Sequence, residues 1–375
     1  MVRLPERSGL NISYLSRLFD NMSESYKIFW FKAILEEMAA GRDETAREEI
    51  SFDTLINHMI ADAWYMVEEY RLNLGPSDTL LEAAVSCAGR ISGLKSSEKR
   101  EKILAFLEES EDSELKKYKR TLCQHVPFRL QAPFMPDFRG NTCWKARPEE
   151  LARRINQRDQ LIYYFVGISG LDSRIRVQKD WASYMRKNQE ILSGWIQYNL
   201  ILYLQRRNPS VPGISSKLRP PAERKLERVK RYWKTIVDLE PVHDIYSGQI
   251  LTEEAVSIDH FVPWSYVAHD ELWNLTPTIR SVNSSKSNAL PDWERYFVPL
   301  CHSEYQAYRL NWKYESVHKL FESCKREHVN SGEAEMKLYR EGLCEKEFSD
   351  NLRTILLPVY QAAKNQGFAD WRYHG

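Results

Sequence analysis

Three side chains in one short segment are of the types that cleave phosphate esters. The segment VSIDHFVPWSYVAHDELWNLTPTIRSVNSSKSNALP runs from Val256 to Pro291. Asp259 supplies hard oxygen donors of the kind that Mg²⁺ and Mn²⁺ prefer, and Asn283 could add an amide oxygen to the same ion. His260 carries an imidazole that titrates near neutral pH and could deprotonate a water. Together these groups could hydrolyse a phosphodiester bond with the help of one hydrated ion.

Other polar residues of the segment could bind the substrate and shape the site. Asn283 lies three residues after Arg280 and three before Lys286, so one helix face could carry a metal ligand and phosphate contacts together. Asn274 lies where a polar loop rejoins a predicted strand. Its side chain could fix the loop that aims His260 through backbone hydrogen bonds.

The elements that must position these residues are two strands and a helix. We predict strands in VSIDHFV and WNLTPTI, and a helix that starts near Arg280 and ends before Pro291. Adjacent strand residues point to opposite faces, so Asp259 and His260 can share a site if the strand bends or bulges there. Pro263, just downstream, favours such a bend.

This segment resembles the HNH (ββα-metal) endonuclease family, including the HNH domains of McrA-like restriction endonucleases and RNA-guided CRISPR nucleases. The matching text is IDHFVPWS, then LWNLTPT, then VNSSKSNALP, and the resemblance covers about Tyr246 to Pro291. The third position of the pattern is Asn in place of His, a common variant. Residues 1 to 205 show no comparably specific resemblance.

The resemblance implies a role for each residue of the pattern. His260 would be the general base, and Asp259 and Asn283 would be the ligands of one Mg²⁺ or Mn²⁺ ion. Asn274 would order the catalytic loop, and Lys286 would contact a phosphate. Many relatives carry a zinc-binding CxxC before the aspartate, whereas the equivalent stretch here, HDIYSGQIL, has no cysteine. We therefore expect no structural zinc.

A basic stretch precedes this segment in a nearly neutral protein, whose net charge is +1. Between Arg206 and Ile236, ten Lys or Arg residues stand against two Glu, a net charge of +8. Lys230, Arg231 and Lys234 are the candidates for a strip that tracks phosphates. The alternative is a solvated helix face that follows a basic linker.

The rest of the chain is mainly helical. Residues 9 to about 120 predict helices, among them one capped by Ser51, and an aromatic connector follows at 126–148. Short strands are expected at 160–168 and 173–177, and a helix at 181–205. The fold class is therefore mainly α with a small α+β part, in which helices flank a ββα-metal HNH domain.

Three parts are predicted: a helical N-terminal domain over 1–205, a Pro-rich basic linker over 206–222, and the nuclease domain over 223–375 with its core at 244–291. We expect a cytoplasmic protein without a membrane span, because no stretch approaches the length of apolar sequence that a span requires.

Metal-dependent cleavage of DNA is the expected function, with RNA as an open alternative and a restriction or anti-phage defence role by analogy. One rival is a catalytically inactive HNH-fold subunit that binds nucleic acid or serves as a scaffold. Another is an effector that stays silent until a protein partner, a second copy or a signal engages the N-terminal helices.

Overall fold

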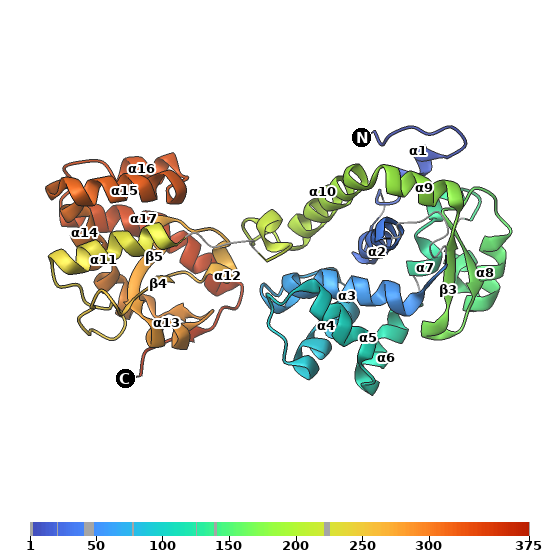
Figure 1. Cartoon of the computed structure of the whole chain (residues 1–375), viewed down its shortest axis with the longest axis horizontal. Helices are drawn as coiled ribbons and strands as arrows, with labels where there is room; N and C mark the ends of the chain where they lie inside the picture. Colours follow the sequence, from blue (N-terminus) through green and yellow to red (C-terminus); the bar gives the residue numbers. More distant parts are fainter. Residues whose placement is uncertain are drawn as a thin grey trace. The chain divides into compact units, whose positions relative to one another are not determined.

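The computed structural model describes residues 3–20, 22–40, 49–76, 79–124, 126–138, 141–220 and 226–374. Helices hold 61% of the residues and strands 8%. The predicted mainly α fold with a small α+β part is therefore confirmed. Contacts divide the chain into unit 1, which is Met1–Pro209 with Lys217–Pro220, and unit 2, which is Ser210–Ser216 with Pro221–Gly375 (Figure 1). No helix among the described residues is long and apolar enough to cross a membrane.

Unit 1 is built mostly from helices that bury aromatic and aliphatic faces. Ser51 caps its longest early helix as predicted, because its hydroxyl accepts a hydrogen bond from the backbone N–H of Thr54 at 3.0 Å. The helices are α1 (Ile12–Leu15), α2 (Tyr26–Ala40), α3 (Phe52–Glu68), α4 (Thr79–Ser92), α5 (Arg100–Glu109), α6 (Ser113–Leu122), α7 (Val126–Arg129), α8 (Pro148–Asn156), α9 (Lys179–Lys187) and α10 (Gln189–Arg207).

A small antiparallel sheet completes unit 1, in the order β1 (Glu49–Ser51), β3 (Arg174–Val177), β2 (Tyr163–Gly167). Strands β2 and β3 fall where the sequence predicts them. The three-residue strand β1 was missed, because it is too short to show an alternating pattern. The helix predicted over 181–205 is wrong in one respect, since it divides at Asn188 into α9 and α10.

The segment predicted as a linker, 206–222, is partly helical where it is described. Its first two residues continue α10, and a 3-10 turn covers Ile214–Lys217. Residues 221–225 lie outside the described part, so the predicted start of the following helix at 223 is not described either. The described helix there is α11 (Glu227–Leu239).

Unit 2 surrounds a two-stranded hairpin with helices (Figure 1). The hairpin strands are β4 (Val256–His260) and β5 (Leu275–Ile279), and the short helix α13 (Arg280–Lys286) follows directly, in the predicted ββα order. The remaining elements are α12 (Trp264–Val267), β6 (Leu290–Pro291), α14 (Trp293–Lys313), α15 (Glu315–His328), α16 (Gly332–Leu338), α17 (Glu345–Asn365) and β7 (Asp370–Trp371).

The hairpin is regular from end to end. Its antiparallel register runs without a shift from Val256 opposite Ile279 to His260 opposite Leu275. The strand therefore contains no bulge, and a bend follows it at Phe261 and Val262, just before Pro263. Because the strand is regular, its side chains alternate between a face covered by α13 and a face covered by α11.

Candidate active site

Helix α13 lies across the face of β4 that carries Ser257 and Asp259, since residues two apart on a strand share a face. The amide nitrogen of Asn283 donates to the hydroxyl of Ser257 at 3.1 Å and to the backbone carbonyl of Ile258 at 3.0 Å. Because the amide nitrogen of Asn283 already donates hydrogen bonds to two atoms of β4, its amide oxygen is the atom that can serve as a metal ligand.

Asp259 is buried on this face and clamped by two neighbours. The hydroxyl of Tyr246 donates to Oδ2 at 2.6 Å, and the ammonium of Lys286 lies 3.1 Å from Oδ1 and 3.0 Å from Oδ2. The same ammonium donates to the backbone carbonyl of His260 at 2.7 Å. The carboxylate is thus held in place by one charged and one neutral donor.

The position of Lys286 differs from the prediction. We expected a phosphate contact, but the side chain is 0% exposed and its ammonium forms an ion pair with Asp259. Burial lowers the pKa of Lys286, whereas the neighbouring carboxylate acts to raise it. The physical reason is that Lys286 lies one helical turn after Asn283, on the same inward face of α13.

Tyr246 is positioned by a tight turn that sequence reasoning did not single out. The carboxylate of Asp244 accepts hydrogen bonds from the backbone N–H of Tyr246 at 2.9 Å and from the hydroxyl of Thr278 at 2.9 Å. Gly248 closes the turn with a φ of +72°, which suits glycine. An aspartate followed by Ser-Gly is the signal that could have revealed this turn.

The ring of Tyr246 is supported by two aromatic neighbours. It makes edge contacts with Tyr296 of α14 and Trp371 of β7, each with ring centroids 5.3 Å apart. Strand β7 pairs with β6, so a segment far along the chain is fixed next to the turn. These ring contacts therefore hold the Tyr246 hydroxyl in a fixed position next to Asp259.

His260 lies at the end of β4 and is oriented by Asp270. Its Nε2 lies 2.7 Å from Oδ1 of Asp270, so an Nε2–H donates to the carboxylate and Nδ1 remains as the acceptor. The histidine is 6% exposed. Asp270 comes from the loop that follows α12.

The three predicted metal-site side chains come from β4 and α13, and each has its own hydrogen-bond partners. Asp259 and Asn283 share the α13 face, whereas His260 has Asp270 as its partner and shares its face with Val256 and Ile258. What the structure shows is a carboxylate and an imidazole that diverge from adjacent positions of one strand.

Asn274 makes the backbone contacts expected of a loop-ordering residue. Its side-chain oxygen accepts from the N–H of Val262 at 2.8 Å, and its side-chain nitrogen donates to the carbonyl of Val262 at 2.9 Å. Its own carbonyl accepts from the N–H of Phe261 at 2.9 Å. These bonds fix the chain immediately after His260.

The basic residues predicted to contact phosphate lie on both sides of the β4–β5 hairpin. Arg280 is exposed at the start of α13, near Asn283. Arg231 is exposed on α11, Lys230 is half-buried, and Lys234 lies 3.6 Å from Glu253. Helix α11 packs on the other face of the hairpin, so this strip is not brought to the face that carries Asp259.

The donor set suits a hydrated hard cation better than a closed cage. The described residues contain no group of three or more His, Cys, Asp or Glu side chains that could hold a metal. Asp259 and Asn283 offer two oxygen ligands, as an ion that keeps most of its water requires. Such an ion would share the carboxylate with the ammonium of Lys286. The fit is therefore to Mg²⁺ or Mn²⁺ held by few protein ligands.

Comparison with known proteins locates the same segment. Residues 243–292 match the HNH endonuclease family. Searches of curated proteins and of solved structures gave no significant match. HNH nucleases typically use divalent metals. The turn of Asp244, the β4–β5 hairpin and α13 all lie within the matched residues, and this segment is a domain of the HNH endonuclease family.

Proposed function

We propose that unit 2 hydrolyses phosphodiester bonds of DNA, with His260 as general base and a divalent ion held by Asp259 and Asn283. The observation that carries the proposal is the divergence of Asp259 and His260 from the end of one regular strand. Nucleic-acid binding and nuclease activity in general follow from the HNH domain. The substrate and the residue roles are our inference.

The opposite directions of the Asp259 and His260 side chains suit the geometry of phosphodiester hydrolysis. In phosphoryl transfer the attacking and leaving oxygens lie roughly in line on opposite sides of phosphorus. A phosphate placed at the end of β4 would have the imidazole of His260 on one side and the carboxylate of Asp259 on the other. A single point of convergence, as first expected, is therefore not needed.

His260 would remove the proton from the attacking water. Its Nδ1 is the free base of the tautomer that the bond to Asp270 selects. The charge on Asp270 would stabilise the imidazolium that forms. Asn274 would hold the next residues in place through its bonds to Val262.

Asp259 and Asn283 would hold the ion through their side-chain oxygens. A divalent ion, when bound, supplies charge stabilisation for the phosphate and the leaving oxygen. Tyr246 and Lys286 keep the carboxylate of Asp259 in one orientation, so little reorganisation is needed.

Substitution of the base tests this proposal. His260→Ala should lower the rate of Mg²⁺-dependent DNA cleavage by at least about 100-fold, the usual contribution of a general base. The matched control is His302→Ala, whose side chain is 75% exposed and which pairs with Glu345 in the same unit. A His260→Ala protein that cuts DNA as fast as the control would refute the assigned role.

A second candidate function is favoured by one observation. The buried ammonium of Lys286 already neutralises Asp259, as a nucleic-acid-binding subunit without catalysis would permit. Cleavage assays with Mg²⁺ and Mn²⁺, run beside gel-shift assays on DNA and RNA, separate the two. Binding without cleavage under any of these conditions would support the non-catalytic function. A role in restriction or anti-phage defence rests on the family resemblance alone.

A further inference from the structure

The loop that carries Asp270 is anchored to the end of α15, and the nuclease proposal gives this anchor no role. The side chain of Asp270 accepts a hydrogen bond from Nε2 of His260 at 2.7 Å. The backbone carbonyl of Asp270 accepts a second hydrogen bond, from Nδ1 of His328 at 3.0 Å. His328 is the last residue of α15. A chain of hydrogen bonds therefore runs from α15 through Asp270 to His260.

A second anchor lies one residue farther along the same loop. One carboxylate oxygen of Glu271 accepts hydrogen bonds from the side-chain nitrogen of Asn330 at 2.8 Å and from its backbone N–H at 3.2 Å. The indole N–H of Trp273 donates to the other oxygen at 3.1 Å. Glu271 is 6% exposed, so these bonds lie in the interior of unit 2. The segment at the end of α15 thus holds two successive residues of the loop.

The start of the loop has a conformation that requires such support. Ala268, directly after α12, has a φ of +55°, a left-handed conformation that is unfavourable for a residue with a Cβ atom. A conformation of this kind persists where surrounding contacts determine it. The bonds from His328 and Asn330 act two and three residues later, where the loop presents Asp270 to His260.

The side chain of His328 makes one hydrogen bond within the described residues, and that bond goes to Asp270. Because a carbonyl can only accept, Nδ1 of His328 carries the proton. The residue is 3% exposed, and its Nε2 is buried without a hydrogen-bond partner in the described part of the chain. An apolar ring of similar size would fill the space without leaving a nitrogen unbonded. The bond to Asp270 is what distinguishes His328 from such a ring.

We propose that His328 is a positioning residue of the nuclease site, which fixes the loop so that Asp270 holds His260 with its proton on Nε2. The inference rests on the proposed function, because it concerns the residue that would take the proton from water. A fixed carboxylate selects which nitrogen of His260 is the free base. A base that is misplaced or in the wrong tautomer lowers the rate of the chemical step and leaves substrate binding unchanged.

Substitutions of His328 in the full-length protein test this role. His328→Phe removes the donor and keeps a ring of similar size, so kcat for DNA cleavage should fall at least about tenfold while KM stays the same. His328→Asn keeps a side-chain N–H near the position of Nδ1 and should restore most of the rate. The matched control is His318→Phe, on the same helix, whose ring lies against Trp312 of α14. This control should cleave as the wild type does.

The tautomer of His260 gives a second readout, which does not depend on activity. In protein with isotope-labelled histidine, the NMR signals that are missing from His260→Ala identify this residue. The wild type should carry the proton on Nε2 of His260, and His328→Phe should show a mixture of both tautomers. In His328→Asn the proton should return to Nε2.

The two readouts separate this inference from the proposed function. An unchanged tautomer of His260 in His328→Phe would overturn the inference, and it would leave the nuclease proposal intact. A wild type that does not cleave DNA, but whose His260 tautomer depends on residue 328, would refute the nuclease proposal and support the positioning role.

Discussion

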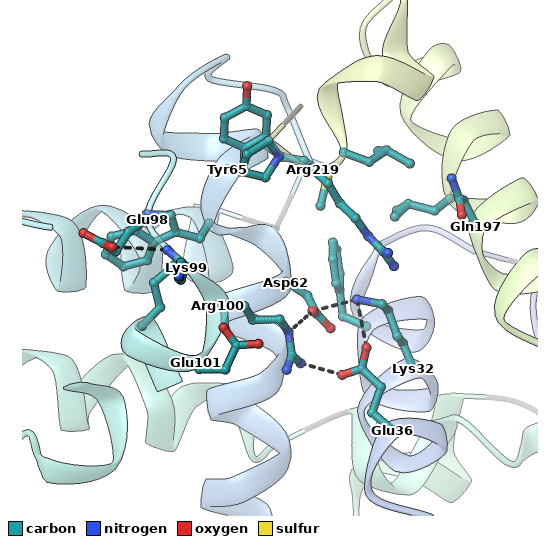
Figure 2. A pocket seen from close by; sticks show the side chains of 18 of the residues that line it. Lys32, Glu36, Asp62, Tyr65, Glu98, Lys99, Arg100, Glu101, Gln197 and Arg219 are labelled. Atoms are coloured by element: carbon teal, nitrogen blue, oxygen red, sulfur yellow. Dashed lines mark hydrogen bonds and ion pairs between the residues drawn. The ribbon is translucent and has the colours of Figure 1, made fainter. Parts of the chain in front are cut away.

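The two units each bury an aspartate against a lysine, and the two sites differ in how completely the carboxylate is bonded. Asp259 of unit 2 has Lys286 at both oxygens and Tyr246 at one of them. Asp62 of unit 1 has Lys32 and Arg100 at one oxygen (Figure 2) and no partner for the other within the described residues. Asp259 is therefore held in one orientation by bonds at both oxygens, whereas Asp62 keeps one buried oxygen without a hydrogen bond in the described part of the chain.

The cations differ as well. The side chain of Lys286 is 0% exposed, whereas that of Lys32 is 18% exposed and shares its aspartate with Arg100. Unit 2 therefore relies on one buried charge to hold Asp259. Unit 1 spreads the same task over two cations, and loss of either leaves the other in place.

This contrast predicts the largest difference in stability between two lysine substitutions. Lys286→Met should cost about 3–5 kcal/mol of unfolding free energy, because it leaves the buried charge of Asp259 unpaired. Lys32→Met should cost less, since Arg100 still pairs with Asp62. Chemical denaturation of the two full-length variants gives the comparison. Equal costs would contradict the contrast.

A double variant sharpens that result. Asp259→Asn added to Lys286→Met removes the unpaired charge, so part of the lost stability should return. If the double variant is less stable than Lys286→Met alone, the cost does not come from the uncompensated carboxylate.

The next effect concerns pH and unit 1. Although burial acts to lower it, hydrogen bonds to Glu36 and Glu37 raise the pKa of His58 from 6.5 to about 9. Since the folded pKa is the higher one, the stabilisation is complete below pH 6.5 and is lost as the pH rises through 9. The loss should reach about 3 kcal/mol.

Denaturation of the wild type and of His58→Gln between these pH values measures it. The wild type should lose stability across the window, and the variant should show a flatter profile. Parallel profiles would show that His58 does not carry the dependence.

The smallest effect concerns the tyrosine clamp. Tyr246→Phe should cost about 2 kcal/mol, because a buried hydrogen bond to a charged group is lost. Tyr360→Phe is the control, since its hydroxyl donates to the neutral carbonyl of Pro291 at 3.0 Å, and about 1 kcal/mol is expected. Calorimetry should also show weaker Mn²⁺ binding for the Tyr246 variant and unchanged binding for the control.

Much of unit 2 could be predicted from the sequence because its signals are local. The ββα order, the hairpin strands and the backbone contacts of Asn274 follow from alternation and turn chemistry within one short segment. The inward position of Lys286 could not be predicted, because the same spacing from Asn283 fits a phosphate contact as well as a buried ion pair. Tyr246 was missed because its support comes from Trp371, far along the chain.

The helices of unit 1 could be predicted from the sequence, whereas its buried cluster of charged side chains could not. Asp62, Lys32 and Arg100 lie on three helices or their starts, and no motif links them in sequence. A charged residue on a predicted helix is normally assigned to a solvated face. Only packing in three dimensions shows that Asp62 is buried and bonded to both cations.

Binding of Mn²⁺ to single variants tests the division of labour at the HNH site most directly. Titration of the full chain should show one ion bound, and Asn283→Ala should weaken its binding by at least about tenfold. His260→Ala should bind the ion as the wild type does, because its side chain lies on the other face of β4. Unchanged binding by Asn283→Ala, or loss of binding in His260→Ala, would contradict the account.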